Sequence, residues 1–437
     1  MSPLVGVMMA TGCASDCVDC VQAMTELGLL RGDGSTLTTV QDAREGDALY
    51  DGGTALGDRW ALHVGPGHLL AGTPLASQVL SVDFRTVGDA LLSDALFGSL
   101  AGEQVEDRFG SSLATSTGLL WVGAEYRDVG RGRPDAGAAY LFSDMGTGWT
   151  GERLASDADL VVLGEQPYQH VGSVVHVCRD LDGDGLEDLL VTAGWDHTGA
   201  NLGGRVFAVL STERADLTRE VLVGGLSTSW WSTDEGALLG RSLGCLDVDG
   251  DGIEEALLGA PYADGEAGDA TGAVYAVSVD APGAVQDVAL VAFEGLSEQS
   301  YLGWSLAVGD LGADGVIELV AGAPGAVDGR GAVAVYVPSG GLRTIFRGTE
   351  PGRFGEAVRL ADLDGDGALD LVVGAPKVDT IWLYDGANST AWPRVVDDVD
   401  ADGALAAAGA GSRLAAGDVD SDGDDDLVLA LETSVVE

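Results

Sequence analysis

Apolar residues in this chain come in short runs, each preceded by an acidic loop and followed by small turn residues. In residues 361–376, aspartates alternate with other residues before the run Leu371–Val373, and the tripeptide Gly-Ala-Pro follows that run. Short apolar runs bounded by glycine and proline predict β-strands. Beyond the turn the chain continues into further predicted strands, for example 272–277, 331–336 and 381–386. The pattern therefore predicts many short strands and an all-β fold.

The acidic loop within that stretch has the spacing of a cation site. Asp362, Asp364 and Asp366 stand at positions 1, 3 and 5, Gly367 lets the backbone curl, and Asp370 stands at position 9. Several oxygen ligands in a flexible loop suit Ca²⁺ better than Mg²⁺, which demands stricter geometry. An EF-hand would need flanking helices and a glutamate at position 12, where this loop already continues as an apolar strand. We therefore predict a calcium loop between two β-strands.

The same block recurs along the chain, and such self-similarity indicates a repeat architecture. Acidic loops of this pattern begin at Asp180, Asp247, Asp310, Asp362 and Asp418. A glycine precedes each loop, and two earlier copies have this glycine but no acidic loop. These marker glycines are residues 57, 110, 172, 240, 303, 355 and 411, spaced by 53, 62, 68, 63, 52 and 56 residues. Seven repeats are therefore predicted, near residues 57–105, 106–168, 169–236, 237–299, 300–351, 352–407 and 408–437.

Three motifs together resemble the FG-GAP repeat of the integrin α-subunit head and its bacterial relatives. They are Phe354-Gly355, the DxDxDGxxD loop and the Gly-Ala-Pro that follows it, and the resemblance runs from about Ala48 to the C-terminus. It implies a seven-bladed β-propeller with Ca²⁺ in the rim loops of some blades. It also implies that positions 1, 3, 5 and 9 supply side-chain ligands and that position 7 offers a backbone carbonyl.

Carried onto this sequence, those ligand positions imply about four or five Ca²⁺ sites. The Asp310 loop departs from the pattern because Gly312 occupies position 3, so its site is expected to be weak or to need an extra water. The predicted ligands are Asp180, Asp182, Asp184, Leu186, Asp188, Asp247, Asp249, Asp251, Ile253, Glu255, Asp310, Asp314, Val316, Glu318, Asp362, Asp364, Asp366, Ala368, Asp370, Asp418, Asp420, Asp422, Asp424 and Asp426.

Closure of the ring poses a problem at the last repeat. After Asp426 the chain offers one strand, Leu427–Leu431, whereas other repeats continue into more. Residues 46–52 resemble the missing partner, so we expect this N-terminal segment to complete the last blade and leave no open edge there. The domain prediction is accordingly a signal-like segment 1–20, a tether 21–45 with at most a short helix near Val21–Leu30, and a propeller 46–437.

Charge excludes one class of partner. The chain has 70 acidic against 22 basic residues and a net charge of −48, so phosphate backbones would be repelled and no nucleic acid is expected. Bound calcium would offset part of this charge, and the remainder is an acidic, solvated surface. No run of 18 apolar residues occurs, so no transmembrane helix is expected.

The cysteines give information on the cellular location of the protein and on its chemistry. Residues 10–13 are similar to a bacterial lipobox in which Cys13 would carry a lipid anchor, although no basic residue precedes the apolar run. The alternative, an iron–sulfur ligand set of Cys13, Cys17 and Cys20, lacks a supporting domain. Cys178 and Cys245 stand where other repeats have apolar residues, so we expect them to be buried small side chains without a redox role.

Several smaller motifs are explained by coincidence or by a structural role. Arg31–Asp33 is an RGD tripeptide that we attribute to coincidence, and the loop-like stretch 398–403 is expected to be a solvated turn, since position 9 is Ala406. Tryptophans could stack on sugars, but burial within blades is the expectation; they include Trp149, Trp195, Trp230, Trp231 and Trp304. No nucleophile elbow, phosphate loop, HExxH or dinucleotide fingerprint is present, so no enzyme is predicted.

The functional prediction is a calcium-stabilised, secreted or cell-surface propeller that acts as a binding, adhesion or scaffold module. Its calcium is structural, because the carboxylates fill the coordination shell and leave no position for a substrate. The partner would be a protein or a glycan at the surface, and the chain itself a monomer. Candidate binding loops are Arg127–Ala136 and Tyr262–Thr271. A lectin is the alternative, and the non-catalytic propeller of a surface hydrolase or lyase comes after it.

Overall fold

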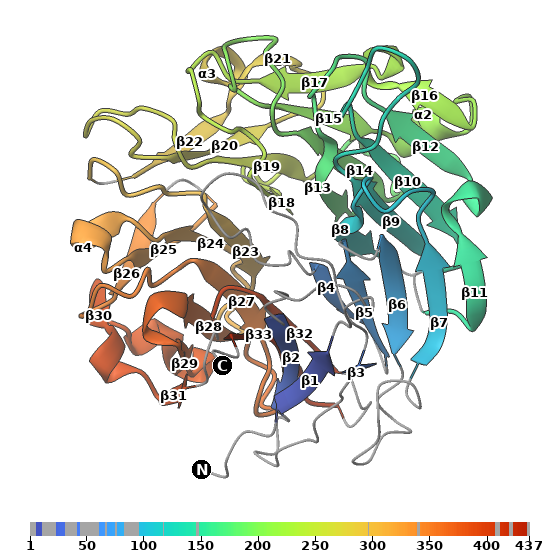
Figure 1. Ribbon diagram of the computed structural model, residues 1–437. Coiled ribbons are helices and arrows are strands. Elements are labelled where there is room, and N and C mark those ends of the chain that lie inside the picture. The colour runs from blue at the N-terminus through green and yellow to red at the C-terminus, as the bar shows by residue number, and fades with distance from the viewer. Residues whose placement is uncertain are drawn as a thin grey trace.

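The computed structural model of the chain is a ring of β-sheets (Figure 1). It describes residues 6–10, 23–30, 42–43, 61–65, 68–74, 77–82 and 96–434, apart from 117, 146–147, 296, 339–340, 407–410 and 419–422. Within those residues there are seven sheets of four or five strands each. The helices in this part of the chain are short turns between strands, namely α2 (Ser211–Arg214), α3 (Val285–Val288), α4 (Ala326–Gly329), η2 (Ala155–Asp157), η3 (Val223–Gly225), η4 (Pro376–Val378), η5 (Gly386–Ala391) and η6 (Asp398–Asp400).

Each sheet is one blade, built outward from the axis by antiparallel neighbours. Blade one contains β4 (Ala61–Gly65), β5 (His68–Thr73), β6 (Gln78–Val82) and β7 (Leu96–Ala101). Blade two contains β8 (Phe109–Thr115), β9 (Leu119–Ala124), β10 (Ala138–Ser143) and β12 (Leu160–Leu163). Blade three contains β13 (Val171–Cys178), β14 (Asp188–Ala193), β15 (Arg205–Val209) and β17 (Thr228–Trp231). Blade four contains β18 (Ser242–Leu246), β19 (Glu255–Ala260), β20 (Ala273–Val277) and β22 (Val291–Glu294). Blade five contains β23 (Ser305–Gly309), β24 (Glu318–Ala323), β25 (Ala332–Tyr336) and β26 (Leu342–Arg347). Blade six contains β27 (Ala357–Ala361), β28 (Asp370–Ala375), β29 (Thr380–Tyr384) and β31 (Gly403–Ala406).

The seventh blade joins the two ends of the chain. It contains β32 (Leu414–Gly417), β33 (Asp426–Ser434), β2 (Ala23–Leu30), β1 (Gly6–Ala10) and β3 (Asp42–Ala43). The innermost strands contact one another in an unbroken cycle, β4, β8, β13, β18, β23, β27, β32 and back to β4. The all-β, seven-bladed propeller predicted from the repeats is therefore confirmed.

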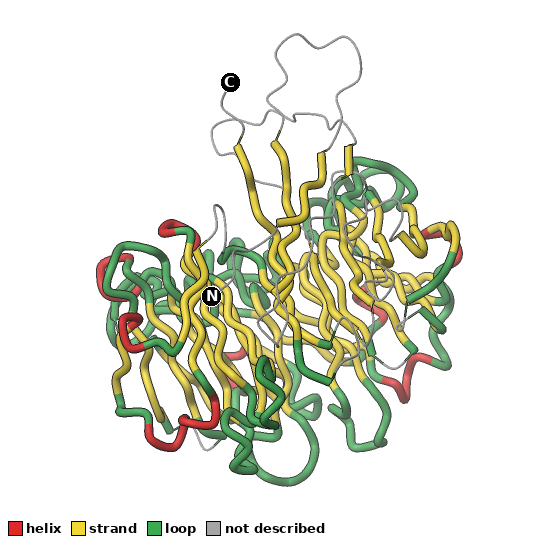
Figure 2. Tube along the Cα trace, turned by 90° about the horizontal axis from the view of Figure 1, so that it is seen from below, coloured by secondary structure: helices red, strands yellow, loops and turns green. Residues whose placement is uncertain are grey.

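Closure by the N-terminal part of the chain is also confirmed, but through a different segment. β2 pairs antiparallel with β33, from Ala23 opposite Ser434 to Leu30 opposite Leu427. The expected tether with a short helix there is wrong, because the free edge of β33 supplies backbone partners for an extended chain. Residues 46–52, expected to close the ring, lie outside the described part of the chain. Figure 2 shows the strands beside the C-terminus extending beyond the ring on one side.

Four blades receive a fifth strand from the blade that follows. Each of these strands lies in the connection between the third and fourth strands of its own blade and pairs in parallel with the previous blade's outer strand. The added strand gives the outer edge a partner and links neighbouring blades. The added strands are β11 (Gly151–Leu154) on β7, β16 (Glu220–Leu222) on β12, β21 (Gly283–Ala284) on β17 and β30 (Val395–Asp397) on β26.

The hydrophobic core lies between facing blades. β14, β19, β24 and β28 are buried along their whole length, which explains why each acidic loop is followed by a continuous apolar run rather than an alternating one. The cluster between blades one and two, for example, joins Leu70, Val79 and Leu100 to Phe109 and Tyr140. Burial on both faces makes each blade depend on its two neighbours.

The two glycine motifs meet across the blade interfaces. Gly411 has a φ of +98°, and a Cβ placed on Gly374 would lie 2.0 Å from the Gly411 carbonyl oxygen. Only glycine at both positions lets the backbones come so close. The same relation holds for Gly72 with Gly110, Gly123 with Gly172, Gly259 with Gly303, and Gly322 with Gly355. The marker glycine and the Gly-Ala-Pro glycine are therefore two sides of one blade contact.

A disulfide joins blades three and four. Cys178, the last residue of β13, is bonded to Cys245 on β18. The expectation that these cysteines are merely small buried side chains is wrong. The two positions precede equivalent loops in successive repeats, so propeller geometry brings them side by side, with a Cα–Cα distance of 5.7 Å.

Candidate metal centre

Each described acidic loop joins the first strand of a blade to the second, so the repeated topology puts these loops at one end of the ring. Within a loop, the position-1 carboxylate accepts the N–H of the turn glycine, at 2.9 Å for Asp180 with Gly185 and for Asp362 with Gly367. The position-9 carboxylate accepts the N–H of position 2, at 2.7 Å for Leu181 with Asp188. These bonds pull the two ends of the loop together and turn the carboxylates inward.

Among the described residues, three loops each bring three carboxylates together, with the candidate oxygens within 4.8 Å of one another. The trios are Asp180, Asp182 and Asp188; Asp247, Asp249 and Asp251; and Asp362, Asp364 and Asp366. A compact set of hard oxygen donors is what Ca²⁺ prefers, so the residues fit the predicted ion. His176 also lies near Cys178 and Cys245, but those two sulfurs are bonded to each other.

The residue at position 7 is held beside position 5. In four loops its N–H donates to the position-5 carboxylate, at 2.7 Å for Leu186, 2.8 Å for Ile253, 3.0 Å for Val316 and 2.8 Å for Ala368. The second oxygen of Asp184 accepts a hydrogen bond from the Ser211 hydroxyl over 2.5 Å. That bond comes first among the causes that lower the pKa of Asp184.

Burial and the neighbouring carboxylates raise the pKa of the carboxyl group at position 9 in two loops. Burial, and then the nearby carboxylates of Asp249, Asp251 and Asp247, raise the pKa of Glu255 to about 7. Burial in the same way raises the pKa of Asp370 to about 6, with the carboxylate of Asp364 adding to the effect. A bound divalent cation would relieve this repulsion and stabilise the ionised form.

Position 8 connects successive loops. The N–H of Glu254 donates to the Asp180 carbonyl over 2.9 Å, while the Glu254 carboxylate accepts the N–H of Arg179 over 2.8 Å. Blades six and seven repeat this link with Asp425 and Asp362. Between blades two and three, Ser116 donates to Glu187 over 2.5 Å. Two pairs of predicted sites, in blades three and four and in blades six and seven, are thus joined across a blade interface.

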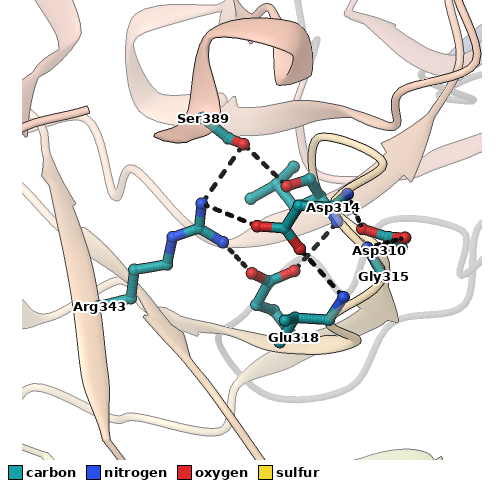
Figure 3. A network of polar contacts seen from close by, with 8 residues as sticks. Asp310, Asp314, Gly315, Glu318, Arg343 and Ser389 are labelled. Atoms are coloured by element: carbon teal, nitrogen blue, oxygen red, sulfur yellow. Dashed lines mark hydrogen bonds and ion pairs between the residues drawn. The ribbon is translucent and has the colours of Figure 1, made fainter. Parts of the chain in front are cut away.

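The two remaining predicted loops have no carboxylate trio among the described residues. In the seventh blade Asp418, Asp424 and Asp426 are described, whereas Asp420 and Asp422 lie outside the described residues. In the fifth blade Asp314 and Glu318 contact the guanidinium of Arg343, while Asp310 accepts N–H groups of its own loop (Figure 3). Sequence reasoning missed Arg343, and Gly312 at position 3 was the one local signal that this loop is unusual.

Most of the other candidates from the sequence have structural roles. Trp149 and Trp230 are buried, and the Trp304 ring is covered by the guanidinium groups of Arg241 and Arg353 at 4.7 and 5.0 Å. The burial expected of Trp195 is wrong, because that side chain is 48% exposed. The loop-like stretch at 398–403 includes η6, and Asp398 is buried and accepts the Thr349 N–H over 2.9 Å. Asp398 thus departs from the expected solvated turn, because it satisfies the backbone of a neighbouring strand connection.

Fold and loops together define a repeat β-propeller with acidic turns between the first two strands of its blades. A model of the FG-GAP repeat matches residues 354–392. Integrin alpha-PS5 of Drosophila melanogaster is 34% identical over 172 residues, which cover 34% of this chain and 16% of the relative. Phosphatidylinositol-glycan-specific phospholipase D of Bos taurus is 30% identical over 178 residues, 39% of this chain and 21% of the relative. The chain therefore contains an FG-GAP repeat and, over a part of its length, is similar to integrin α chains.

These matches reach only about a fifth of each relative's length. Among solved structures, a chain of the Kuenenia stuttgartiensis hydrazine synthase aligns with a TM-score of 0.50 at 12% identity, covering 89% of this chain and 100% of that one. At such identity the likeness concerns the fold alone. Within the described residues, no helix is long and apolar enough to cross a bilayer.

Proposed function

We propose that this chain is a calcium-stabilised propeller that works outside the cytosol as a binding or scaffold module. The observation that carries the proposal is the repeated trio of carboxylates, found in three blades within 4.8 Å. Uncompensated carboxylates at that separation repel one another, and an ion that binds only the native state stabilises it by mass action. Sites of this kind in extracellular modules have a Kd of about 10⁻⁴ to 10⁻³ M, which suits a calcium-rich exterior.

The compartment is supported by a second observation. The Cys178–Cys245 disulfide favours an oxidising environment, since reducing compartments keep such pairs as thiols. Secretion or surface display therefore agrees with both the metal and the sulfur chemistry. A lipid anchor at Cys13 stays a prediction, because that residue lies outside the described part of the chain, and so does the monomeric state.

The ligand we favour is a protein, and similarity to integrin α chains supports that choice. The chain has a net charge of −48, so a partner with a basic face would gain long-range attraction. A glycan ligand has less support, because Trp149 and Trp230 are buried and Trp304 is covered by arginines, which leaves the 48% exposed Trp195 as the candidate sugar-stacking ring. Similarity to a phospholipase D keeps the non-catalytic propeller of a hydrolase as the second candidate.

The test is a binding screen against surface proteins and a glycan array, each run in millimolar Ca²⁺ and again with chelator. We expect a protein hit that is lost when calcium is removed. The control is the same chain with Asp180, Asp247 and Asp362 replaced by asparagine, which weakens the three trios without altering the outer loops. A folded chain that binds neither proteins nor glycans, with or without calcium, would contradict the binding role.

A further inference from the structure

The loop of blade five encloses an arginine side chain. Arg343, on β26, makes an ion pair with the Glu318 carboxylate and lies 3.8 Å from Oδ2 of Asp314 (Figure 3). Glu318 has no exposed side-chain surface and that of Arg343 is 19% exposed, so this is a largely buried charge pair. Asp314 and Glu318 occupy positions 5 and 9, which would be ligand positions in the other loops.

The position-9 carboxylate has a different partner in blades three and six, whose loops hold a carboxylate trio. There the oxygen not used by position 2 accepts a backbone N–H, from Ser211 to Asp188 at 2.7 Å and from Gly386 to Asp370 at 2.8 Å. In blade five Leu311 donates to one oxygen of Glu318 over 3.0 Å, and the guanidinium of Arg343 takes the other. The neutral donor found in other blades is thus replaced by a full positive charge.

Position 3 of the same loop has no room for a metal-binding side chain. Gly312 has a φ of +102°, and a Cβ there would lie 2.0 Å from the hydroxyl oxygen of Ser389. Ser389 belongs to η5 of the next blade, is buried, and donates to the Leu311 carbonyl over 2.9 Å. Arg343 in turn donates to the Ser389 hydroxyl over 3.4 Å. A serine therefore stands where the third carboxylate would be, and it is tied into the arginine network.

We propose that the Arg343 guanidinium is the built-in cation of blade five, so that this loop is held closed without a metal ion. Three acidic side chains remain in the loop, Asp310, Asp314 and Glu318, and the single positive charge of Arg343 contacts the latter two and offsets one of their negative charges. The planar fork suits carboxylates approached from several directions. The contrast with the other loops rests on the proposed calcium binding, whereas the internal ion pair itself does not.

The first test counts bound calcium by equilibrium dialysis of the full chain. Asp314→Asn should leave the number of bound ions unchanged. Asp366→Asn, which alters the same position 5 in blade six, should lower it by one. Both side chains accept the N–H of position 7, at 3.0 and 2.8 Å, so the variants are locally matched. Loss of one ion in Asp314→Asn would overturn the proposal.

The second test needs no calcium and separates the two hypotheses. In chelator, Arg343→Met should lower the thermal midpoint by several degrees, because Glu318 is left buried and unpaired. Arg347→Met is the control, since Arg347 lies on the same strand and pairs with Asp397 where both side chains are about 40% exposed. Equal midpoints for the two variants would overturn the internal cation, even in a chain that binds calcium.

A third arm covers an Arg343→Met chain that does not fold. Adding Glu318→Gln should restore folding, because it removes the orphaned charge together with its partner. Failure of the double variant to improve on the single one would contradict the ion-pair role. If wild type binds no calcium while Arg343→Met is selectively destabilised, the proposed function fails and the internal cation stands.

Discussion

The backbone N–H of Asp362 donates a hydrogen bond to Oδ2 of Asp425 over 3.0 Å, and the N–H of Asp425 donates to the Asp362 carbonyl over 2.8 Å. Asp362 opens the acidic loop of blade six, and Asp425 is position 8 of the loop in blade seven. A predicted calcium ligand of one blade is therefore positioned by its neighbour. The two loops form one structural unit across the interface.

We predict from this link that Asp425→Ala weakens calcium binding in blade six. A hydrogen bond to a charged group contributes about 1.5–3 kcal/mol, so loss of the preorganised loop should reduce affinity by about tenfold to a hundredfold. Isothermal titration calorimetry would measure this change. Asp216→Ala removes one negative charge from an exposed turn far along the chain and serves as the control. Equal losses in both variants would point to net charge rather than to the interface link.

Calcium removal is predicted to destabilise the propeller as a whole, since each blade is packed between two others. Chelator should lower the thermal midpoint, and calcium should restore it in proportion to the logarithm of its free concentration. Asp364→Ala should remove the site in blade six and leave the sites in blades three and four filled. Melting curves that respond to neither calcium nor chelator would rule out the metal assignment.

A pH dependence follows from Glu255, whose folded-state pKa of about 7 lies above its ordinary value of 4.5. In chelated protein the folded state binds a proton that the unfolded state has already released between these values. The stability contributed by Glu255 is therefore present below about pH 4.5 and is lost as pH rises towards 7. Calcium affinity should change the opposite way, increasing over the same interval, because the ion needs the ionised carboxylate.

Glu255→Gln tests this assignment directly. Without a titrating group at position 9, the variant should lose the part of the pH dependence between 4.5 and 7 that wild type shows in chelator. Chemical denaturation at a series of pH values would measure both proteins. Identical pH profiles would mean that the dependence arises elsewhere, for example at Asp107, whose pKa burial raises to about 6.

The disulfide between Cys178 and Cys245 should stabilise blades three and four. Its partners are 67 residues apart, and loops of such length imply about 4 kcal/mol on the chain-entropy argument. Reductant should therefore lower the thermal midpoint of wild type. The Cys178→Ala/Cys245→Ala variant should have a lower thermal midpoint than wild type even without reductant. Peptide mapping without reductant should recover the two cysteines in one cross-linked fragment. Free thiols at both positions in protein from an oxidising compartment would contradict the bond.

Much of the propeller and of its candidate site can be predicted from the local sequence. The ligands of one loop, such as Asp362 to Asp370, lie within nine residues, so spacing alone predicts that they can converge. Seven marker glycines predict seven blades, because each repeat must bury the same two faces against identical neighbours. Gly374 and Gly411 explain why the motif glycines recur, although their contact itself is visible only in the folded ring.

Tertiary structure decided what depends on distant segments. Ala23–Leu30 closes the ring because β33 has a free edge, and nothing within those eight residues distinguishes such a strand from a short helix. Arg343 enters the Asp310 loop from another strand, Ser389 comes from the next blade, and Cys178 meets Cys245 across 67 residues. Sequence determined which loops could hold a cation, whereas only the packing of one blade on the next supplied a guanidinium in blade five. Local spacing encodes contacts within a turn, but contacts between blades depend on the geometry of the assembled ring.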